Sequence, residues 1–140
     1  MKSLVTRLMS VGMALAAVTA VYAQSKIVTA NVPFSFYMGS SLMPQGAYRV
    51  SEISNGAMVR ITSMHSVAAK AETTVSVIGK KQVEPARLVF RRYGEDYFLA
   101  QVWTGDGSAG QAFARSPREK ELAQSGAAPP LAMIQVFLHR

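Results

Sequence analysis

The stretch RLVFRRYGEDYFLAQVW, residues 87–103, decides the fold class. Apolar and aromatic residues recur with a strand-like period on both sides of a central glycine, which predicts two antiparallel strands joined by a tight turn. A three-residue loop over 94–96 places Tyr93 opposite Tyr97 and Leu88 opposite Val102. We prefer it to a two-residue loop, which would mix arginine into the apolar face. That face then carries Leu88, Phe90, Phe98, Ala100 and Val102.

A second hairpin is predicted upstream by Asn55-Gly56, because a type I′ turn needs two positive φ angles. The predicted pairs are Ile53 with Met58, Val50 with Ile61, and Tyr48 with Ser63. One face of this hairpin carries Tyr48, Val50, Val59 and Ile61, and the other carries Arg49, Ser51, Arg60 and Thr62. This separation of apolar from polar residues supports the register.

The remaining segments extend the β pattern. Residues 27–38 predict a strand in which Pro33 implies an edge, a bulge or a strand start, and 39–46 a loop. Residues 67–78 predict one or two strands, 79–86 a charged connection, 104–110 a flexible loop and 131–138 a final strand. A short helix is predicted to begin at Ser116-Pro117-Arg118-Glu119, with Ser116 as its cap and Glu119 completing a capping box.

About eight short strands and one short helix near the C-terminus predict an all-β fold. We expect a small antiparallel β-barrel or a β-sandwich, and the sequence does not choose between the two.

The first 23 residues have the pattern of a cleaved signal peptide. Lys2 and Arg7 precede an uncharged, mostly apolar stretch over 8–21, which is shorter than the ~20 residues of a membrane-spanning helix. Residues 21–23, Val-Tyr-Ala, place small side chains before a cleavage point at Gln24. We therefore expect residues 1–23 to be removed and residues 24–140 to form a single β-rich domain. The expected location is the periplasm or the medium, with no transmembrane span after processing.

The composition limits the chemistry. The chain has no cysteine, which excludes disulfides, thiolate catalysis and cysteine-ligated zinc, and His65 and His139 offer little for a metal site. The whole chain has 15 basic and 8 acidic residues, and loss of two basic residues with the signal leaves 13 − 8 = +5. Such a charge favours an anionic partner, although it is also an ordinary surface property.

No pattern indicates an enzyme or a cofactor. Residues 105–110 match G-x-G-x-x-G, but Pro117 soon restarts the structure, whereas a dinucleotide site needs a long helix at the last glycine. The neighbouring acids Glu95 and Asp96 suit a solvated turn, and Glu119 and Glu121 face different ways on a helix. The sequence contains neither G-x-S-x-G nor S-x-x-K. We expect no catalytic residue, no metal and no nucleotide cofactor.

One strip of residues is a candidate binding surface. Arg87, Arg91 and Tyr93 share one face of the first strand of the 87–103 hairpin, and Tyr97 and Trp103 lie opposite. Arginines interleaved with aromatic rings can stack on sugars or bases and bind phosphates or carboxylates. The alternative is a structural ladder of cross-strand pairs.

Three segments resemble a pattern shared by a group of short secreted bacterial proteins of unknown function. They are NVPFSF (31–36), LMPQGAYRV (42–50) and the hairpin from Leu88 to Trp103, followed by REKEL (118–122). The group's second segment reads L-P-x-G-x-Y-x-V, so this chain has one more residue before the proline. Its third segment often has histidine where this chain has Arg91. The resemblance implies no activity, cofactor or catalytic residue.

Three functions remain open at this point. The first is a non-catalytic exported domain that binds a protein or an anionic component of the cell envelope. The second is a small-ligand carrier with an apolar pocket inside a β-barrel, lined by Met38, Met58, Met64 and Met133. The third is a hydrolase with an unrecognised site. The sequence does not indicate an oligomeric state.

Overall fold

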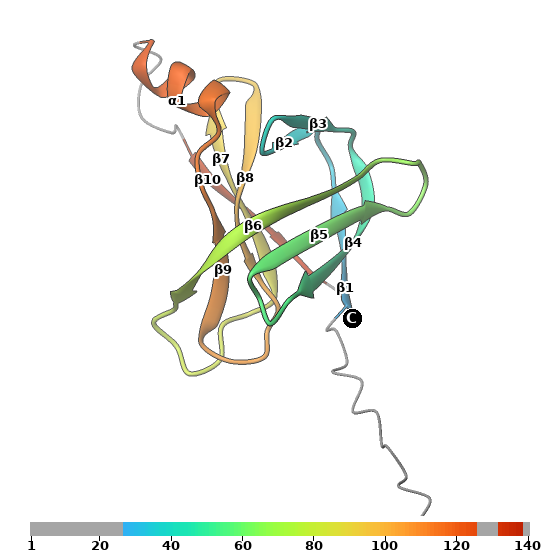
Figure 1. The fold of residues 1–140 in the computed structure, drawn as a ribbon, viewed down its shortest axis with the longest axis vertical. Coiled ribbons are helices and arrows are strands. Elements are labelled where there is room, and N and C mark those ends of the chain that lie inside the picture. The colour runs from blue at the N-terminus through green and yellow to red at the C-terminus, as the bar shows by residue number, and fades with distance from the viewer. Residues whose placement is uncertain (1–26, 126–131, 139–140) are drawn as a thin grey trace, which may run out of the picture.

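The computed structural model describes residues 27–125 and 132–138, which form ten strands and one helix (Figure 1). In chain order these are β1 (Ile27–Val32), β2 (Phe36–Met38), β3 (Ser41–Met43), β4 (Gly46–Ile53), β5 (Met58–Ser63), β6 (Ala69–Ile78), β7 (Arg87–Tyr93), β8 (Asp96–Trp103), β9 (Ala109–Phe113), α1 (Pro117–Gln124) and β10 (Ala132–Phe137). The all-β prediction with a short helix near the C-terminus is confirmed. The expected signal peptide lies outside the described residues.

Two of the ten strands fall where the sequence predicted no strand. The segment 39–46 was predicted as a loop but contains β3, and β9 begins inside the predicted loop 104–110. The predicted strand 27–38 is broken into β1 and β2 by residues 33–35, which begin with Pro33, and 67–78 yields one strand, β6. Strands of three and five residues give too few alternations to stand out in a sequence.

The strands form one continuous mixed sheet. Hydrogen-bonded neighbours follow the order β1-β4-β5-β6-β9-β8, after which β8 pairs with β7 and β7 with β10. These pairs are antiparallel, as predicted, but β2 joins β8 in parallel through Tyr37 and Phe98, and β3 pairs with β2. The prediction of a purely antiparallel arrangement is therefore wrong at β2.

Strand β6 divides this sheet into two parts. Its first half, residues 69–73, pairs with β5, and its second half, residues 74–78, pairs with β9. Figure 1 shows that β4, β5 and β6 cross β7, β8 and β9 at a steep angle. A strand that passes from one part to the other makes the corner of such a packing, with the core between the two inner faces.

The β4–β5 hairpin has the predicted register. Ile53 pairs with Met58, Val50 with Ile61 and Tyr48 with Ser63. In the turn, Asn55 and Gly56 have φ of 57° and 85°, and the Ala57 N–H donates to the Ser54 carbonyl at 3.1 Å. The predicted apolar face, Tyr48, Val50, Val59 and Ile61, is fully buried. Local turn chemistry and the apolar pattern agree here, so the sequence alone specifies the register.

The β7–β8 hairpin differs from its prediction near the turn. Tyr93 pairs with Asp96 rather than Tyr97, so the loop is two residues long. The register shifts between Val89 and Phe90, and beyond that bulge Leu88 pairs with Val102 as predicted. The bulge inserts one extra residue and so returns the apolar side chains to the inner face.

The segments that resemble the bacterial pattern meet in the core. Phe36 packs edge-on against Tyr48 and Phe90, with ring centroids 5.3 and 5.2 Å apart. The Tyr48 hydroxyl donates to the Pro44 carbonyl, which closes the turn that carries the proline. Met43 is only 2% exposed, whereas Leu42 is 60% exposed. The residue directly before the proline is therefore the one that packs in the core. These residues specify the fold.

Candidate functional site

The five residues of the predicted strip lie at two ends of the β7–β8 hairpin. Arg91, Tyr93 and Tyr97 lie near the turn, under α1 and beside Phe34. Arg87 and Trp103 pair with each other at the other end of the hairpin. The structure therefore does not assemble one continuous surface from the strip, and we describe the two ends separately.

At the end near the turn, Glu119 of α1 binds two residues of β7. Arg91 donates from Nε to Oε1 of Glu119, and from Nη2 to Oε2 at 3.0 Å. The Tyr93 hydroxyl donates to Oε1 at 3.1 Å. Glu119 is 1% exposed, and the Arg91 side chain is largely buried. We call this group the closed triad; both carboxylate oxygens of Glu119 are occupied by Arg91 and Tyr93.

The closed triad explains how a polar helix docks on the sheet. Glu119 is the buried residue of α1, and its backbone N–H donates to the Ser116 hydroxyl at 3.2 Å, which confirms Ser116 as the cap. The Glu119 carboxylate binds Arg91 and Tyr93 of β7 instead of turning back to the Ser116 backbone, so the prediction that Glu119 completes a capping box is wrong. Burial, followed by the negative charge of Glu119, raises the pKa of Tyr93 above its ordinary value.

Tyr97 is also held by neighbouring side chains. Its ring stacks on Phe34 with centroids 3.9 Å apart and planes 16° from parallel. The Arg92 guanidinium lies 5.4 Å from the same ring. Phe34 in turn packs edge-on against Phe90 in the core, at 5.0 Å. Tyr97 thus links the core to the hairpin surface.

At the other end, Trp103 lies between an arginine and a glycine. The Arg87 guanidinium carbon is 4.7 Å from the centroid of the Trp103 ring. A Cβ atom on Gly110 of β9 would come within 2.6 Å of the same ring, so only glycine leaves it room. The Trp103 indole N–H donates to Gln101 at 3.0 Å. The last glycine of the G-x-G-x-x-G match therefore has a packing role.

Glu84 joins this end to the connection between β6 and β7. Its carboxylate accepts from the Lys81 backbone N–H at 3.0 Å and from Arg87 Nη1 at 3.2 Å. The hydrogen bond from Lys81 is the largest cause that lowers the pKa of Glu84 below its ordinary value, and the Arg87 charge adds to it. The Glu84 carboxylate is therefore ionised and already bound within the chain.

A groove of about 390 Å³ opens beside Trp103. It is lined by Val77, Ile78, Gly79, Lys80, Lys81, Glu84, Arg87, Gln101 and Trp103. Lys80 and Lys81 are exposed, and neither side chain makes an ion pair within the described residues. Arg87 donates from Nη1 to the Glu84 carboxylate and to the Pro85 carbonyl. Its Nε is buried without a partner, and within the described residues Nη2 makes no hydrogen bond. We call this the open groove.

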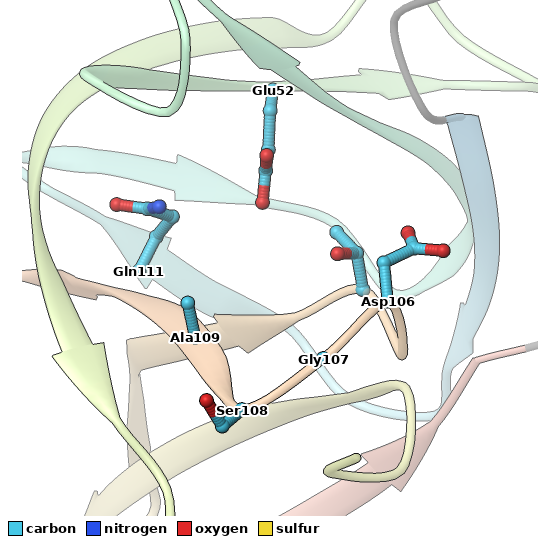
Figure 2. A pocket seen from close by; sticks show the side chains of 7 residues that line it. Glu52, Asp106, Gly107, Ser108, Ala109 and Gln111 are labelled. Atoms are coloured by element: carbon cyan, nitrogen blue, oxygen red, sulfur yellow. The ribbon is translucent and has the colours of Figure 1, made fainter. Parts of the chain in front are cut away.

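A second pocket, of about 330 Å³, lies between β4 and the loop before β9. Figure 2 shows Glu52 reaching from β4 toward the loop that carries Asp106, with Gln111 beside it. Gln111 and Gly110 are neighbours on β9 and therefore point to opposite faces, so this acidic pocket and the open groove lie on opposite sides of the strand. Two carboxylates make the pocket unsuitable for an anion.

The described part of the chain shows neither a clustered metal site nor the methionine-lined pocket. In residues 27–125 and 132–138, no three histidine or acidic side chains are grouped so that they could hold a metal ion. Met38 is fully buried in the core, whereas Met58 and Met64 flank opposite ends of β5, about 20 Å apart. The Met133 side chain lies outside the description. Helices with the length and apolar character of a membrane span are likewise absent from the described residues.

Comparison with known proteins adds no relative: no protein-family model, no curated protein and no solved structure matches the chain. The candidate site therefore depends on its own geometry. Sequence reasoning identified Arg87 and Trp103 but missed the adjacent lysines and Glu84. The signal that could have found them is the charged run Lys80-Lys81, which follows a strand directly and precedes Arg87 by a short connection.

Proposed function

We propose that the protein is a non-catalytic binding domain, exported to the periplasm or the medium, whose open groove holds an anionic component of the cell envelope. One observation carries this proposal. Lys80, Lys81 and Arg87 border the groove together with Glu84, and the Glu84 carboxylate is bound by the Lys81 backbone and by Arg87. Two lysine ammonium groups therefore remain for a ligand.

The shape of the groove supports the same function. Its volume lies within the range of small-molecule sites, so it can hold one or two units of a polymer or one headgroup. Val77, Ile78 and Trp103 supply apolar lining, and Lys80 and Lys81 supply two exposed cations. A site of this kind selects a negatively charged group by charge and orients it by shape. The excess of basic residues in the mature sequence, 13 − 8 = +5, assists the approach of an anion.

Calorimetric titration with polygalacturonate tests this function, with dextran as the uncharged polymer. We expect the protein to bind polygalacturonate and to show no binding of dextran. The double variant Lys80→Glu/Lys81→Glu should weaken binding about tenfold, because two attractive charges become repulsive. The matched control is Arg49→Glu/Arg60→Glu, which changes the net charge equally at two exposed positions on β4 and β5.

Equal losses in the two double variants would contradict the proposal, because net charge rather than the groove would then determine affinity. Absence of polygalacturonate binding by the wild-type protein would also contradict it. Both variants change exposed side chains, so their unfolding free energies should match that of the wild type.

A further inference from the structure

We propose that the end of the molecule around the open groove docks on an anionic phospholipid surface. The proposal rests on the function proposed above and names the partner of the same site. It is carried by five exposed residues, which we call the end patch: Val75, Ile78, Lys80, Lys81 and Val83.

Apolar side chains of the end patch project into solvent. Val75, Ile78 and Val83 are 68%, 83% and 61% exposed. Single exposed apolar residues are common on proteins, but these three fall within nine residues and are interleaved with two lysines. Apolar side chains that enter the boundary between headgroups and acyl chains, next to lysines that contact anionic headgroups, are the components of peripheral membrane binding.

The end patch lies on a well-supported part of the fold. The Gly79 N–H donates to the Ser108 carbonyl at 2.7 Å, and the Glu84 N–H donates to the Gly107 carbonyl at 2.8 Å. These bonds tie the connection 79–86 to the loop before β9, and Figure 1 shows the two loops together at the lower end of the molecule. Because the backbone is held in place, docking requires little ordering of the chain.

The unpaired edge of β6 is a second feature that indicates a binding partner at this end of the molecule. Strand β5 begins at Met58, opposite Thr73, so the described residues place no strand beside residues 75–78 on that edge. The segment 73–78 has neither a charge nor a proline. Proteins normally protect such an edge by a charge, a proline or a covering element. Val75 and Ile78 point to opposite faces of β6, so a lipid surface that receives the end of the strand, and not one face of it, would cover this edge.

The charges around the end patch suit an anionic surface. Glu84 is bound to Lys81 and Arg87, and the pocket that holds Glu52 and Asp106 opens on the other side of β9. The opposite end of β6 offers a comparison, because the turn there also exposes Met64 and Val67 but carries no lysine between them. Exposed apolar residues occur at both ends, and only this end combines them with a pair of lysines.

Vesicle flotation tests the proposal on the full mature chain. The probes are phosphatidylcholine vesicles and phosphatidylcholine vesicles with about one-third phosphatidylglycerol. We expect flotation with the anionic vesicles only. Lys80→Glu/Lys81→Glu should lower the vesicle affinity at least about tenfold. Val75→Ser/Val83→Ser, two exposed positions outside the lining of the open groove, should lower it by a similar factor and leave polygalacturonate binding unchanged. Met64→Ser/Val67→Ser is the matched apolar control and should float like the wild type.

The outcomes separate the two proposals. Binding to polygalacturonate without flotation would overturn membrane docking and leave the anion-binding groove in place. If the wild type neither binds polygalacturonate nor floats with anionic vesicles, both proposals are overturned. Equal flotation of Val75→Ser/Val83→Ser and wild type would also overturn docking through the end patch. A concentration-dependent dimer that this variant abolishes, without vesicle binding, would assign the β6 edge to self-association instead.

Discussion

The β7–β8 hairpin carries an arginine–glutamate pair at each of its ends, and different segments of the chain surround the two pairs. Arg91 uses both Nε and Nη2 on Glu119, which is 1% exposed and also accepts from Tyr93. Arg87 binds Glu84 through Nη1 alone and borders the open groove. Both pairs are largely buried, with side-chain exposures of 14% and 2% for Arg91 and Glu119 and of 13% and 9% for Arg87 and Glu84. The difference therefore lies in the segments around the pairs and not in the pairs themselves.

The difference comes from what covers each pair. Helix α1 brings Glu119 onto β7 and seals the closed triad, while the connection 79–86 brings Glu84 beside Arg87 and leaves the lysines exposed. Alternation of arginine and aromatic residues in a strand does not distinguish these cases, because the covering segment is distant in sequence. We therefore look for a binding function at the end of the hairpin that lies beside the exposed lysines.

The largest expected effect comes from breaking the closed triad. Glu119→Ala leaves the Arg91 charge buried without a partner and removes the anchor of α1, so we expect unfolding to become about 3–5 kcal/mol easier. Urea denaturation of wild type and variant measures this difference. The triple variant Arg91→Met/Tyr93→Phe/Glu119→Leu removes the polar atoms together and should recover most of the loss. A Glu119→Ala protein as stable as the wild type would show that the triad is not a structural contact.

A smaller effect is expected at the open end, where Gly110 makes room for Trp103. In Gly110→Ala the new methyl group would lie 2.6 Å from the indole ring, so the ring must shift. We expect a loss of about 1–3 kcal/mol in unfolding free energy and a changed near-ultraviolet circular dichroism band of the tryptophan. Trp103→Leu made in the Gly110→Ala background should relieve the conflict. An unaltered tryptophan band in Gly110→Ala would contradict this packing.

The smallest effect is a pH dependence that belongs to Glu84. Its pKa is lowered in the folded protein, first by the Lys81 backbone N–H and then by Arg87, so its contribution to stability is present above the pKa of the unfolded chain. That contribution is lost as the pH falls through the folded-state pKa. We therefore expect wild type and Glu84→Gln to differ in unfolding free energy near pH 7 and to converge as the pH falls below the usual range of a glutamate carboxyl. A difference that grows as the pH falls would contradict the assignment.

Where turn chemistry and apolar alternation agree, the sequence predicts the structure in detail. The β4–β5 register follows from Asn55-Gly56 and from one buried face. The cap at Ser116 follows from the order of Ser116 and Pro117. Both features depend on residues close together in the chain, so no distant contact has to be known.

The errors arise where distant segments decide the local structure. The bulge at Val89 and Phe90 lets a two-residue loop coexist with an apolar inner face, and no sequence pattern marks it. Gly110 was grouped with a loop because its partner, the Trp103 ring, lies across a strand pair. For the candidate site, Arg87 and Trp103 were identified, but Glu84 and the lysines belong to the connection 79–86, whose path beside Arg87 no local pattern marks.

The comparison between the two ends can be tested in one titration followed by nuclear magnetic resonance. Trp103 is the only tryptophan of the chain, so its indole N–H signal reports on the open groove without ambiguity. The Arg91 Nε–H signal reports on the closed triad. On addition of polygalacturonate, we predict that the Trp103 signal shifts with ligand concentration and that the Arg91 signal stays in place. A shift of Arg91 with Trp103 unchanged would contradict the account.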